Sequence, residues 1–263
     1  MLRILISYYD FQKIKRDKFA INLLNMKIAL IGYGRMGHEI EEIAVKRGHT
    51  IQLIVDVDNK SDLNPQKLKG IDVAIEFSTP ETAFENVSVC LNARVPVVCG
   101  TTGWQKDYEQ ACVLCSKNRT SFIHSSNFSI GVNLLFMLNE ELAKQMNRFD
   151  EYVVDIEEIH HTKKLDAPSG TAISLANGIR NSHQAYGGWC FNDKPEKGKV
   201  PIKCIREGVV PGTHTIRWDS SIDSIVLKHE AKNRKGLAFG AVVAAEFIKG
   251  RSGVFTMKDV MGL

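Results

Sequence analysis

The residues best suited to chemistry in this sequence lie in one short run, residues 157–172. The run holds two adjacent histidines, His160 and His161, and two adjacent lysines, Lys163 and Lys164, before the small-residue turn Ala-Pro-Ser-Gly-Thr-Ala. Histidine exchanges protons readily near neutral pH, and a lysine ammonium group supplies countercharge to an anion. The run therefore predicts a site that gives a proton to an anionic ligand.

The segments on either side of the run favour an anion site at the start of a helix. Residues 152–156 predict a strand, and residues 172–176 predict a helix that begins after Pro168 and Ser169. Ser169 suits a helix cap, and Gly170 lets a ligand approach the backbone closely. The first N–H groups of a helix have no partner within it and attract anions. The alternative is a charged loop that only joins strand to helix.

A second motif follows the apolar residues 27–31, which predict a buried parallel strand. It has the Gly-x-Gly-x-x-Gly pattern of a dinucleotide-binding turn and leads into an amphipathic helix. The first glycine permits the tight turn, the second lets pyrophosphate approach, and the third allows close packing of helix against strand. The alternative is a tight turn that binds no ligand. The motif consists of Gly32, Tyr33, Gly34, Arg35, Met36 and Gly37.

An acidic residue follows the next apolar segment. Residues 51–56 predict a strand that ends in Asp56, at the distance from the glycines where an acid binds ribose hydroxyl groups. Asp58 is the competing candidate, because strand ends predicted from sequence are uncertain by a few residues. A carboxylate here repels a 2′-phosphate, so we expect NADH to be preferred. Lys60 is near enough to accommodate that phosphate, which keeps NADPH possible.

Apolar strands and helical segments continue to alternate up to residue 124. Such alternation predicts an α/β fold with a doubly wound parallel sheet of the Rossmann type, which binds ligands at the carboxyl ends of its strands. Small and hydroxylated residues at three of these ends suit a nicotinamide–ribose cleft. The predicted strands cover residues 71–77, 95–99 and 121–124, and the predicted helices cover residues 81–92 and 107–117.

The pattern changes after residue 127. A helix with leucines at helical spacing indicates core packing, and the apolar runs beyond it predict a separate antiparallel or mixed sheet. Residues 184–198 look compact and rich in turns. The predicted elements are a helix at 132–146, strands at 200–206, 214–218 and 224–229, and a helix at 238–249.

Composition narrows the class of protein. The chain has 263 residues, 44% hydrophobic and 24% charged, which suits a globular protein of one large or two modest domains. A net charge of +4 is too small to indicate nucleic-acid binding, and no apolar run reaches the ~20 residues of a membrane span. The spacing of the six cysteines favours reduced thiols in a cytoplasmic protein. Of these, Cys112 and Cys115 are expected to be buried, without a redox or zinc role.

The first 25 residues differ from the rest. They mix apolar and basic residues without the apolar core and cleavage site of a signal peptide, and Asp10 and Asp17 disfavour a transit peptide. Met26 directly precedes the first predicted strand, so we expect residues 1–25 to be a non-native or disordered leader. A docked extra helix is the alternative, and the sequence leaves the true start, Met1 or Met26, open.

The run at residues 157–172 resembles a motif of the dihydrodipicolinate reductase (4-hydroxy-tetrahydrodipicolinate reductase) family, Glu-x-His-His-x-x-Lys-x-Asp-Ala-Pro-Ser-Gly-Thr-Ala. The glycine turn, the Gly-Thr-Thr-Gly sequence at 100–103 and the Asn-Phe-Ser-Ile-Gly sequence at 127–131 are similar to further motifs of that family. The resemblance thus covers both halves of the chain. The matching positions of the run are Glu158, His160, His161, Lys164 and residues 166–172.

This resemblance implies an activity and its residues. The reaction would be the NADH- or NADPH-dependent reduction of 4-hydroxy-tetrahydrodipicolinate (dihydrodipicolinate) to tetrahydrodipicolinate, a step toward diaminopimelate and lysine. His160 would donate the proton, and Lys164 would be a second catalytic group without any metal. The substrate-binding residues would be His161, Ser169, Gly170 and Thr171. The cofactor-binding residues would be Gly32, Tyr33, Gly34, Arg35, Met36, Gly37, Asp56, Phe77, Gly100, Thr101, Thr102, Ser125, Ser126, Asn127 and Phe128.

The resemblance also implies two domains and an oligomer. Residues 26–127 with residues 237–263 would form the dinucleotide-binding domain, and residues 128–236 a smaller α+β domain with a mixed sheet. The exposed sheet of this smaller domain would build a homotetramer. The only other partner expected is a small dicarboxylate substrate, with neither nucleic acid nor membrane.

Three other functions fit parts of the sequence. A metal-dependent hydrolase would use His160 and His161 with Asp166 or His214, but adjacent histidines rarely bind one metal. A nucleotide sensor without turnover has no need of His160 together with Lys164. A dehydrogenase for a sugar or amino acid shares the glycine turn but lacks the His-His run. The sequence assigns no role in the site to Lys163, His214, His229 or Arg234.

Overall fold

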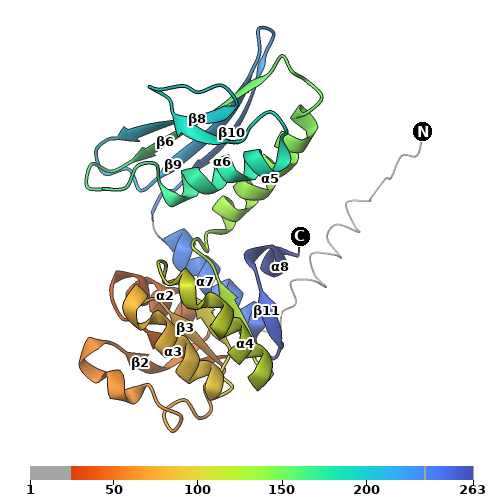
Figure 1. Cartoon of the computed structure of the whole chain (residues 1–263). Helices are drawn as coiled ribbons and strands as arrows, with labels where there is room; N and C mark the ends of the chain where they lie inside the picture. Colours follow the sequence, from red (N-terminus) through yellow and green to blue (C-terminus); the bar gives the residue numbers. More distant parts are fainter. Residues whose placement is uncertain (1–24, 234, 263) are drawn as a thin grey trace, which may run out of the picture.

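A computed structural model of the chain describes residues 25–233 and 235–262. These residues form two sheets, each with its own helices, which lie one above the other in Figure 1. The expected leader, apart from Asn25, lies outside the described residues, and so does Arg234. Within the described ranges, no helix combines the length and the apolar character needed to cross a membrane.

The first sheet has six parallel strands in the order β11-β5-β4-β3-β1-β2. The chain proceeds outward from β1 in one direction to β2 and in the other to β3. Ligands bind in the crevice at the carboxyl ends of the strands beside such a change of direction. The strands are β1 (Lys27–Ile31), β2 (Thr50–Val55), β3 (Val73–Glu76), β4 (Val97–Cys99), β5 (Ser121–His124) and β11 (Gly253–Phe255).

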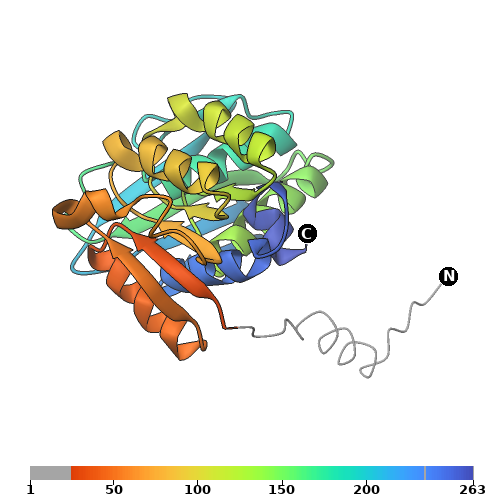
Figure 2. The ribbon, with the colours of Figure 1, turned by 90° about the horizontal axis from the view of Figure 1, so that it is seen from below.

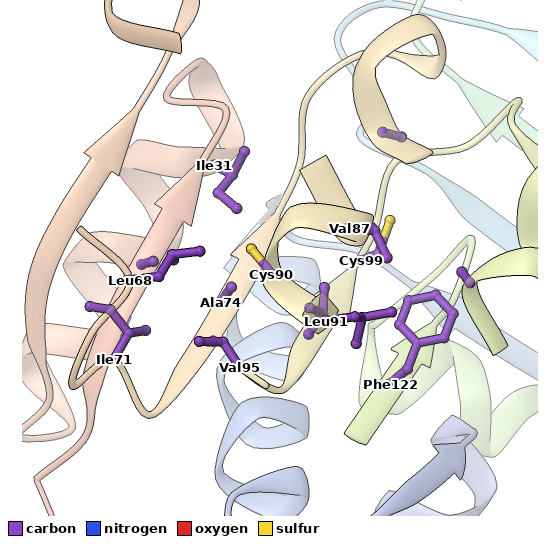
Figure 3. Close-up of a cluster of buried hydrophobic side chains, with 14 of the residues drawn as sticks. Ile31, Leu68, Ile71, Ala74, Val87, Cys90, Leu91, Val95, Cys99 and Phe122 are labelled. Carbon is purple, nitrogen blue, oxygen red and sulfur yellow. The ribbon is translucent and has the colours of Figure 1, made fainter. Parts of the chain in front are cut away.

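Helices cover both faces of this sheet, as a parallel sheet requires. Two helices, α2 and α7, pack together on one face, and α3 and α4 pack together on the other (Figures 1 and 2). Successive strand residues point to opposite faces, so Leu30 packs beneath α2 and α7 while Ile31 and Phe122 join the core beneath α3 and α4 (Figure 3). The helices are α2 (Arg35–Lys46), α3 (Pro80–Asn92), α4 (Tyr108–Asn118) and α7 (Lys235–Ile248), with the short η1 (Val57–Asp62), η2 (Gln105–Asp107) and α8 (Met257–Met261).

The second sheet has five strands in the order β10-β9-β6-β8-β7. Strands β10, β9 and β6 pair antiparallel, whereas β6, β8 and β7 pair parallel, so the sheet is mixed as predicted. Helices α5 and α6 pack on one of its faces. The elements are α5 (Ile130–Met146), β6 (Val153–His160), α6 (Gly170–Ser182), β7 (Gly188–Phe191), β8 (Lys199–Arg206), β9 (Thr213–Asp219) and β10 (Ser224–Glu230).

The structure confirms the fold class and corrects four details of the sequence analysis. Strand β6 continues to His160, well beyond the predicted strand at 152–156, because alternate residues up to His160 stay on the buried face. Strand β7 lies within residues 184–198, where only turns were expected. Neither β11 nor α8 was predicted, because segments of three and five residues carry too little periodicity. Cys115 is buried as expected, but Cys112 is only half-buried.

Candidate active site

A cavity of about 530 Å³ lies where the elements of the first sheet meet those of the second. Its walls come from the segment after β5, the loop after β6, strands β9 and β10, and the start of α7. Five of the predicted site residues line it, namely Asn127, His160, His161, Lys164 and Thr171. Three residues to which the sequence assigned no role line it as well, namely Lys163, His214 and His229.

His160 is the last residue of β6 and is only 7% exposed. Its Nδ1 atom is buried and lies 3.3 Å from Oε2 of Glu158, which is ion-pair distance without the alignment of a hydrogen bond. Its Nε2 atom lies against Gly212 in the cavity wall, where a Cβ would come within 3.0 Å of that nitrogen. One ring nitrogen thus faces a carboxylate and the other faces the cavity, an arrangement suited to a proton donor held by a partner.

Glu158 is a fully buried carboxylate behind His160. Both of its oxygens accept a hydrogen bond from the Ser169 backbone N–H at 3.1 Å, and Oε1 also accepts one from Nη2 of Arg206 at 2.8 Å. Burial alone raises the pKa of Glu158, but the opposing effects of His160, Ser169 and Arg206 outweigh burial and hold the pKa below its ordinary value. A fixed negative charge therefore stands beside the imidazole of His160.

His214 on β9 is a second buried imidazole, and its ring centroid lies 5.1 Å from that of His160. Its Nε2 atom is 3.2 Å from Oγ of Ser169 and 3.8 Å from Oε2 of Glu158. Burial first, and then the charge of His160, lower the pKa of His214 to about 4. His214 is therefore neutral at neutral pH and adds no positive charge beside His160.

The loop after β6 carries the lysine of the site. Lys164 Nζ lies 2.8 Å from both carboxylate oxygens of Asp166. The Asp166 side chain is 60% exposed, so a carboxylate of similar charge can replace it at the ammonium group. The backbone of this loop is held in turn, because the N–H of His161 donates to the carbonyl of Val210 at 2.9 Å.

The start of α6 provides a second place for an anion. Ser169 caps the helix, in agreement with the sequence, and its Oγ accepts a hydrogen bond from the N–H of Ala172 at 3.2 Å. A Cβ built on Gly170 would meet no atom within 4 Å, so the space beside this backbone is open. Thr171 lines the cavity, and its Oγ1 lies 3.5 Å from Nδ2 of Asn127. The remaining N–H groups at this helix start suit a carboxylate.

The glycine turn between β1 and α2 has the shape that a dinucleotide needs. Gly32 has a φ of +86°, and a Cβ there would lie 2.1 Å from the carbonyl oxygen of Phe77. A Cβ on Gly37 would lie 2.6 Å from the carbonyl oxygen of Gly32. In contrast, a Cβ on Gly34 would meet nothing within 4 Å, and α2 begins there without a side-chain cap. Its first N–H groups are available to pyrophosphate, so these residues fit a dinucleotide.

The end of β2 lies beside this turn, since the Gly32 N–H donates to the carbonyl of Val55 at 2.8 Å. Asp56 follows β2 directly and is half-buried. Asp58 lies farther along in η1 and is exposed, as is Lys60. The geometry therefore favours Asp56 over Asp58 as the acid beside a ribose.

The Gly-Thr-Thr-Gly turn after β4 is held from three sides. Oγ1 of Thr101 accepts a hydrogen bond from the Ser78 N–H at 2.8 Å, just after β3. Its carbonyl oxygen accepts one from Nε1 of Trp104 at 2.8 Å and lies 3.0 Å from Nε2 of His124, at the end of β5. Thr102 is exposed. The turn is thus a rigid wall at the carboxyl edge of the sheet.

Two aromatic side chains, Phe77 and Phe128, lie close together at this edge. The ring of Phe77 leaves no room for a side chain at position 100, because a Cβ on Gly100 would lie 2.1 Å from it. The ring of Phe128 lies 6.0 Å from that of Phe77 and is 1% exposed, so this side chain belongs to the core. The turn between β5 and Phe128 is closed by Ser125, whose Oγ donates to the carbonyl of Asn127 at 2.8 Å, while Ser126 is exposed.

Glu158, His160 and His214 also offer atoms of the kinds that bind metals, all within 4.8 Å of one another. The Glu158 oxygens already accept hydrogen bonds from Ser169 and from the Arg206 guanidinium, whose positive charge opposes a second cation. The arrangement therefore favours a cluster that handles protons over a metal site.

The family of the chain follows from comparison with known proteins. Two family models, dihydrodipicolinate reductase N-terminus and dihydrodipicolinate reductase C-terminus, match residues 26–128 and 131–261. The chain belongs to the dihydrodipicolinate reductase family. It is thereby an oxidoreductase of a family that uses pyridine nucleotides.

Individual relatives of this reductase agree with that family. The chain is 52% identical over 237 residues to the 4-hydroxy-tetrahydrodipicolinate reductase of Christiangramia forsetii, covering 90% of this chain and 98% of the relative. It is 34% identical over 238 residues to the protein of the same name from Thermosipho africanus, with coverage of 90% and 98%. The solved structure of a dipicolinate-bound dihydrodipicolinate reductase from Paenisporosarcina sp. TG-14 has a TM-score of 0.75 at 23% identity. It covers 89% of this chain and 98% of that chain, and it supports the fold.

Sequence reasoning missed several residues that line the reductase's cavity or lie behind it. His214 alternates with the buried residues Ile216 and Trp218, and this alternation was the signal that it points inward. His229 is opposite His214 on β10 and lies against Gly131, where a Cβ would come within 2.9 Å of its Nε2. Arg206 had no comparable signal, because its contact with Glu158 depends on how β8 pairs with β6.

Proposed function

We propose that this reductase converts 4-hydroxy-tetrahydrodipicolinate to tetrahydrodipicolinate with NADH or NADPH, a step of diaminopimelate and lysine biosynthesis. The observation that carries the proposal is the cavity in which His160, Lys164 and the start of α6 come together near the carboxyl edge of the parallel sheet. Relatives bearing that name at 52% and 34% identity support it.

The dinucleotide would lie along the carboxyl edge of the first sheet. When bound, the nicotinamide supplies the hydride for the reduction. The N–H groups at the start of α2 hold the pyrophosphate, and the residues after β3, β4 and β5 surround the nicotinamide end. The open space at Gly34 and the rigid turn at Thr101 support this placement. The full set of proposed cofactor-binding residues is the one that the resemblance implied.

The substrate would lie in the cavity, beside this edge. His160 gives a proton from Nε2, the nitrogen that faces the cavity, while Glu158 holds Nδ1. The ammonium group of Lys164 binds one carboxylate of the ring, and the N–H groups of Gly170 and Thr171 bind the other with Ser169 as the cap. His161 contacts the substrate from the adjoining wall.

We propose NADH as the preferred cofactor because of the carboxylate of Asp56. Its place directly after β2 and beside Gly32 suits a ribose hydroxyl and opposes a 2′-phosphate. Replacement of Asp56 by Ser should raise the ratio of kcat/KM with NADPH to kcat/KM with NADH. An unchanged ratio would remove Asp56 from the ribose site.

The proposed assembly is a cytoplasmic homotetramer built through the second sheet. Helices α5 and α6 pack on only one face of that sheet, and the side chains of Val153 and Val226 on the other face are 61% and 49% exposed. We also propose the domain boundaries 26–127 with 237–263, and 128–236. Pairing of β11 with β5 and packing of α7 on α2 support the return of the chain to the first domain.

A coupled assay tests the function. The substrate is generated from pyruvate and aspartate semialdehyde by its synthase, and loss of NADH absorbance is followed for wild type, His160→Gln and Lys164→Ala. We expect NADH consumption only when the synthase is present, with most of the turnover lost in both variants. Wild-type protein that binds NADH and never consumes it would overturn the proposal in favour of a nucleotide sensor.

A further inference from the structure

Two neighbouring glutamates of β6 make ion pairs with β8 on opposite faces of the second sheet. In the parallel register, Glu157 is opposite Lys203, and His160 is opposite Arg206. Glu157 lies 2.9 Å from Lys203, with 32% and 55% of their side chains exposed. Glu158 lies 2.8 Å from Arg206, with 0% and 20% exposed. The same pair of strands thus holds a solvent-exposed ion pair and a buried one.

The ion pair between Glu158 and Arg206 costs the folded state free energy. Removing the Glu158 carboxylate from water costs several kcal/mol before its attraction to the partly exposed Arg206 is counted, and well-packed apolar residues often serve stability as well or better. Val154 and Ile156 precede Glu158 on the same face of β6. Both are apolar and belong to the hydrophobic core of the second sheet. Stability alone therefore gives no reason for a charged pair at this position.

The pair has contacts to three parts of the proposed reaction site. Glu158 faces Nδ1 of His160 and accepts the N–H of Ser169, the cap of α6. Arg206 Nη2 bridges Glu158 to the carbonyl oxygen of Asp166, at 2.8 Å and 2.6 Å. One buried ion pair thereby joins the imidazole, the helix start and the loop that carries the lysine.

We propose that Glu158 and Arg206 are the positioning residues of this site. Glu158 holds His160 with its proton on Nδ1, so that Nε2 is the nitrogen that gains and gives the transferred proton. Arg206 compensates the charge of that carboxylate and fixes the loop at Asp166, which sets the distance between His160 and the two carboxylate sites. This inference rests on the proposed role of His160 as proton donor.

The other charged groups around His160 do not take over this task. The two nearby imidazoles, His214 on β9 and His229 on β10, both have pKa values lowered by burial. His161 adjoins His160, and Lys164 lines the same cavity with its ammonium group on Asp166. Among the described residues, Glu158 is the carboxylate in ion-pair contact with the His160 ring.

Paired variants test the inference in the full-length protein. Glu158→Gln keeps the shape and one oxygen acceptor, and Glu157→Gln is its matched control on the exposed face of the same strand. We expect Glu158→Gln to lower kcat by about 10²-fold, because the proton donor loses its orientation and its countercharge. KM for NADH should stay within about twofold, and the control should match wild type in both kcat and KM.

Arg206→Gln, with Lys203→Gln as its control, tests the role proposed for Arg206. We expect KM for the dicarboxylate to rise about tenfold as the loop at Asp166 loosens, with KM for NADH unchanged. Should Glu158→Gln fail to fold, this variant decides alone, because Arg206 is partly exposed and its loss leaves the helix cap in place. Arg206→Gln that behaves like Lys203→Gln would overturn the proposal.

A readout without turnover separates this inference from the proposed function. NMR of protein with ¹⁵N-labelled histidine reports which ring nitrogen carries the proton, with His160→Gln to assign the signal. We expect the Nδ1–H tautomer at high pH in wild type and in Glu157→Gln, and a mixture in Glu158→Gln. An unaltered tautomer in Glu158→Gln would overturn the inference even if the reductase assay succeeds. A wild type that reduces no substrate but shows the Nδ1–H tautomer would overturn only the proposed function.

Discussion

The ammonium group of Lys164 lies 2.8 Å from each carboxylate oxygen of Asp166, two residues farther along the chain. Asp166 thus holds the ammonium group in the way that we propose for a substrate carboxylate. The pair is exposed on the Asp166 side, and exposed ion pairs contribute only about 0.2–1 kcal/mol. The Asp166 carboxylate is therefore a weak competitor for the substrate carboxylate that we propose at Lys164.

Replacement of Asp166 by Asn should remove this competition. We expect KM for the dicarboxylate to fall by up to about fivefold, the equivalent of one exposed ion pair, with kcat within about twofold of wild type. Steady-state kinetics with varied substrate measures both constants, and Asp193→Asn in an exposed turn is the control. A higher KM would mean that Asp166 helps to hold the substrate instead.

Two glycines of the first turn should respond to alanine in opposite ways. At Gly32, the φ of +86° and the 2.1 Å approach to Phe77 leave no room for a methyl group, so the free energy of unfolding should fall by about 2 kcal/mol or more. At Gly34, the surrounding space is open, so stability should change by less than about 0.5 kcal/mol. NADH binding should nevertheless weaken about tenfold or more, because the methyl group would occupy the place that we propose for the pyrophosphate.

Denaturant unfolding and NADH titration distinguish these effects. If Gly34→Ala binds NADH as wild type does, the pyrophosphate does not lie at the start of α2. If Gly32→Ala is as stable as wild type, the close approach of the turn to Phe77 is not a constraint on the fold.

Glu76 is a fully buried carboxylate at the end of β3, on the side of the site where we propose that the nicotinamide binds. It accepts hydrogen bonds from the Ser78 N–H at 3.1 Å and the Cys99 Sγ at 2.9 Å, and Ser78 in turn donates to Thr101. Glu76→Ala leaves buried donors unpaired, so stability should fall by about 2 kcal/mol. KM for NADH should rise about tenfold, since the turn at Thr101 loses its support.

The control for Glu76→Ala is Glu81→Ala, an exposed glutamate in the first turn of α3. Thermal unfolding and steady-state kinetics with varied NADH compare the two variants. A normal KM for NADH in Glu76→Ala would restrict Glu76 to a role in folding.

His214 makes stability depend on pH in a defined window. Burial and the charge of His160 lower the pKa of His214 in the folded protein from 6.5 to about 4. Between these two pH values, the unfolded chain binds a proton at His214 and the folded chain does not. Stability from this group is therefore complete above pH 6.5 and is lost as pH falls toward about 4, by roughly 3 kcal/mol in all. In His214→Asn this part of the loss should be absent.

The measurement is the free energy of unfolding from denaturant curves at several pH values in that window. Wild type should lose more stability than His214→Asn on acidification. Parallel curves for the two proteins would show that His214 is not buried in its neutral form.

Most of the fold could be predicted from local patterns. The apolar residues 27–31, the glycine turn and the amphipathic helix after it appear where they were expected, because each depends on neighbours a few residues away. Short elements could not be predicted, because a few residues carry too little local pattern. Strand β11 has three residues, and only its pairing with β5 makes it a strand.

The candidate site, like the fold, could be predicted only in part. The run from Glu158 to Thr171 could be identified in advance because its histidines, lysine and helix start are close together in the chain. The role of Glu158 could not, since it depends on partners that come from other strands. His214 is opposite Glu158 on β9, and Arg206 is opposite His160 on β8.

The sequence by itself determined the parallel α/β domain, the dinucleotide turn and the chemical groups of the run at 157–172, because spacing along a strand or helix fixes which residues share a face. Only the tertiary structure decided that Glu158 is buried between His160, His214 and Arg206, and that Asp166 engages Lys164. The physical reason is register. How β8 and β9 align with β6 is set by packing against α5 and α6, and a shift of one residue would turn each of these side chains to the opposite face.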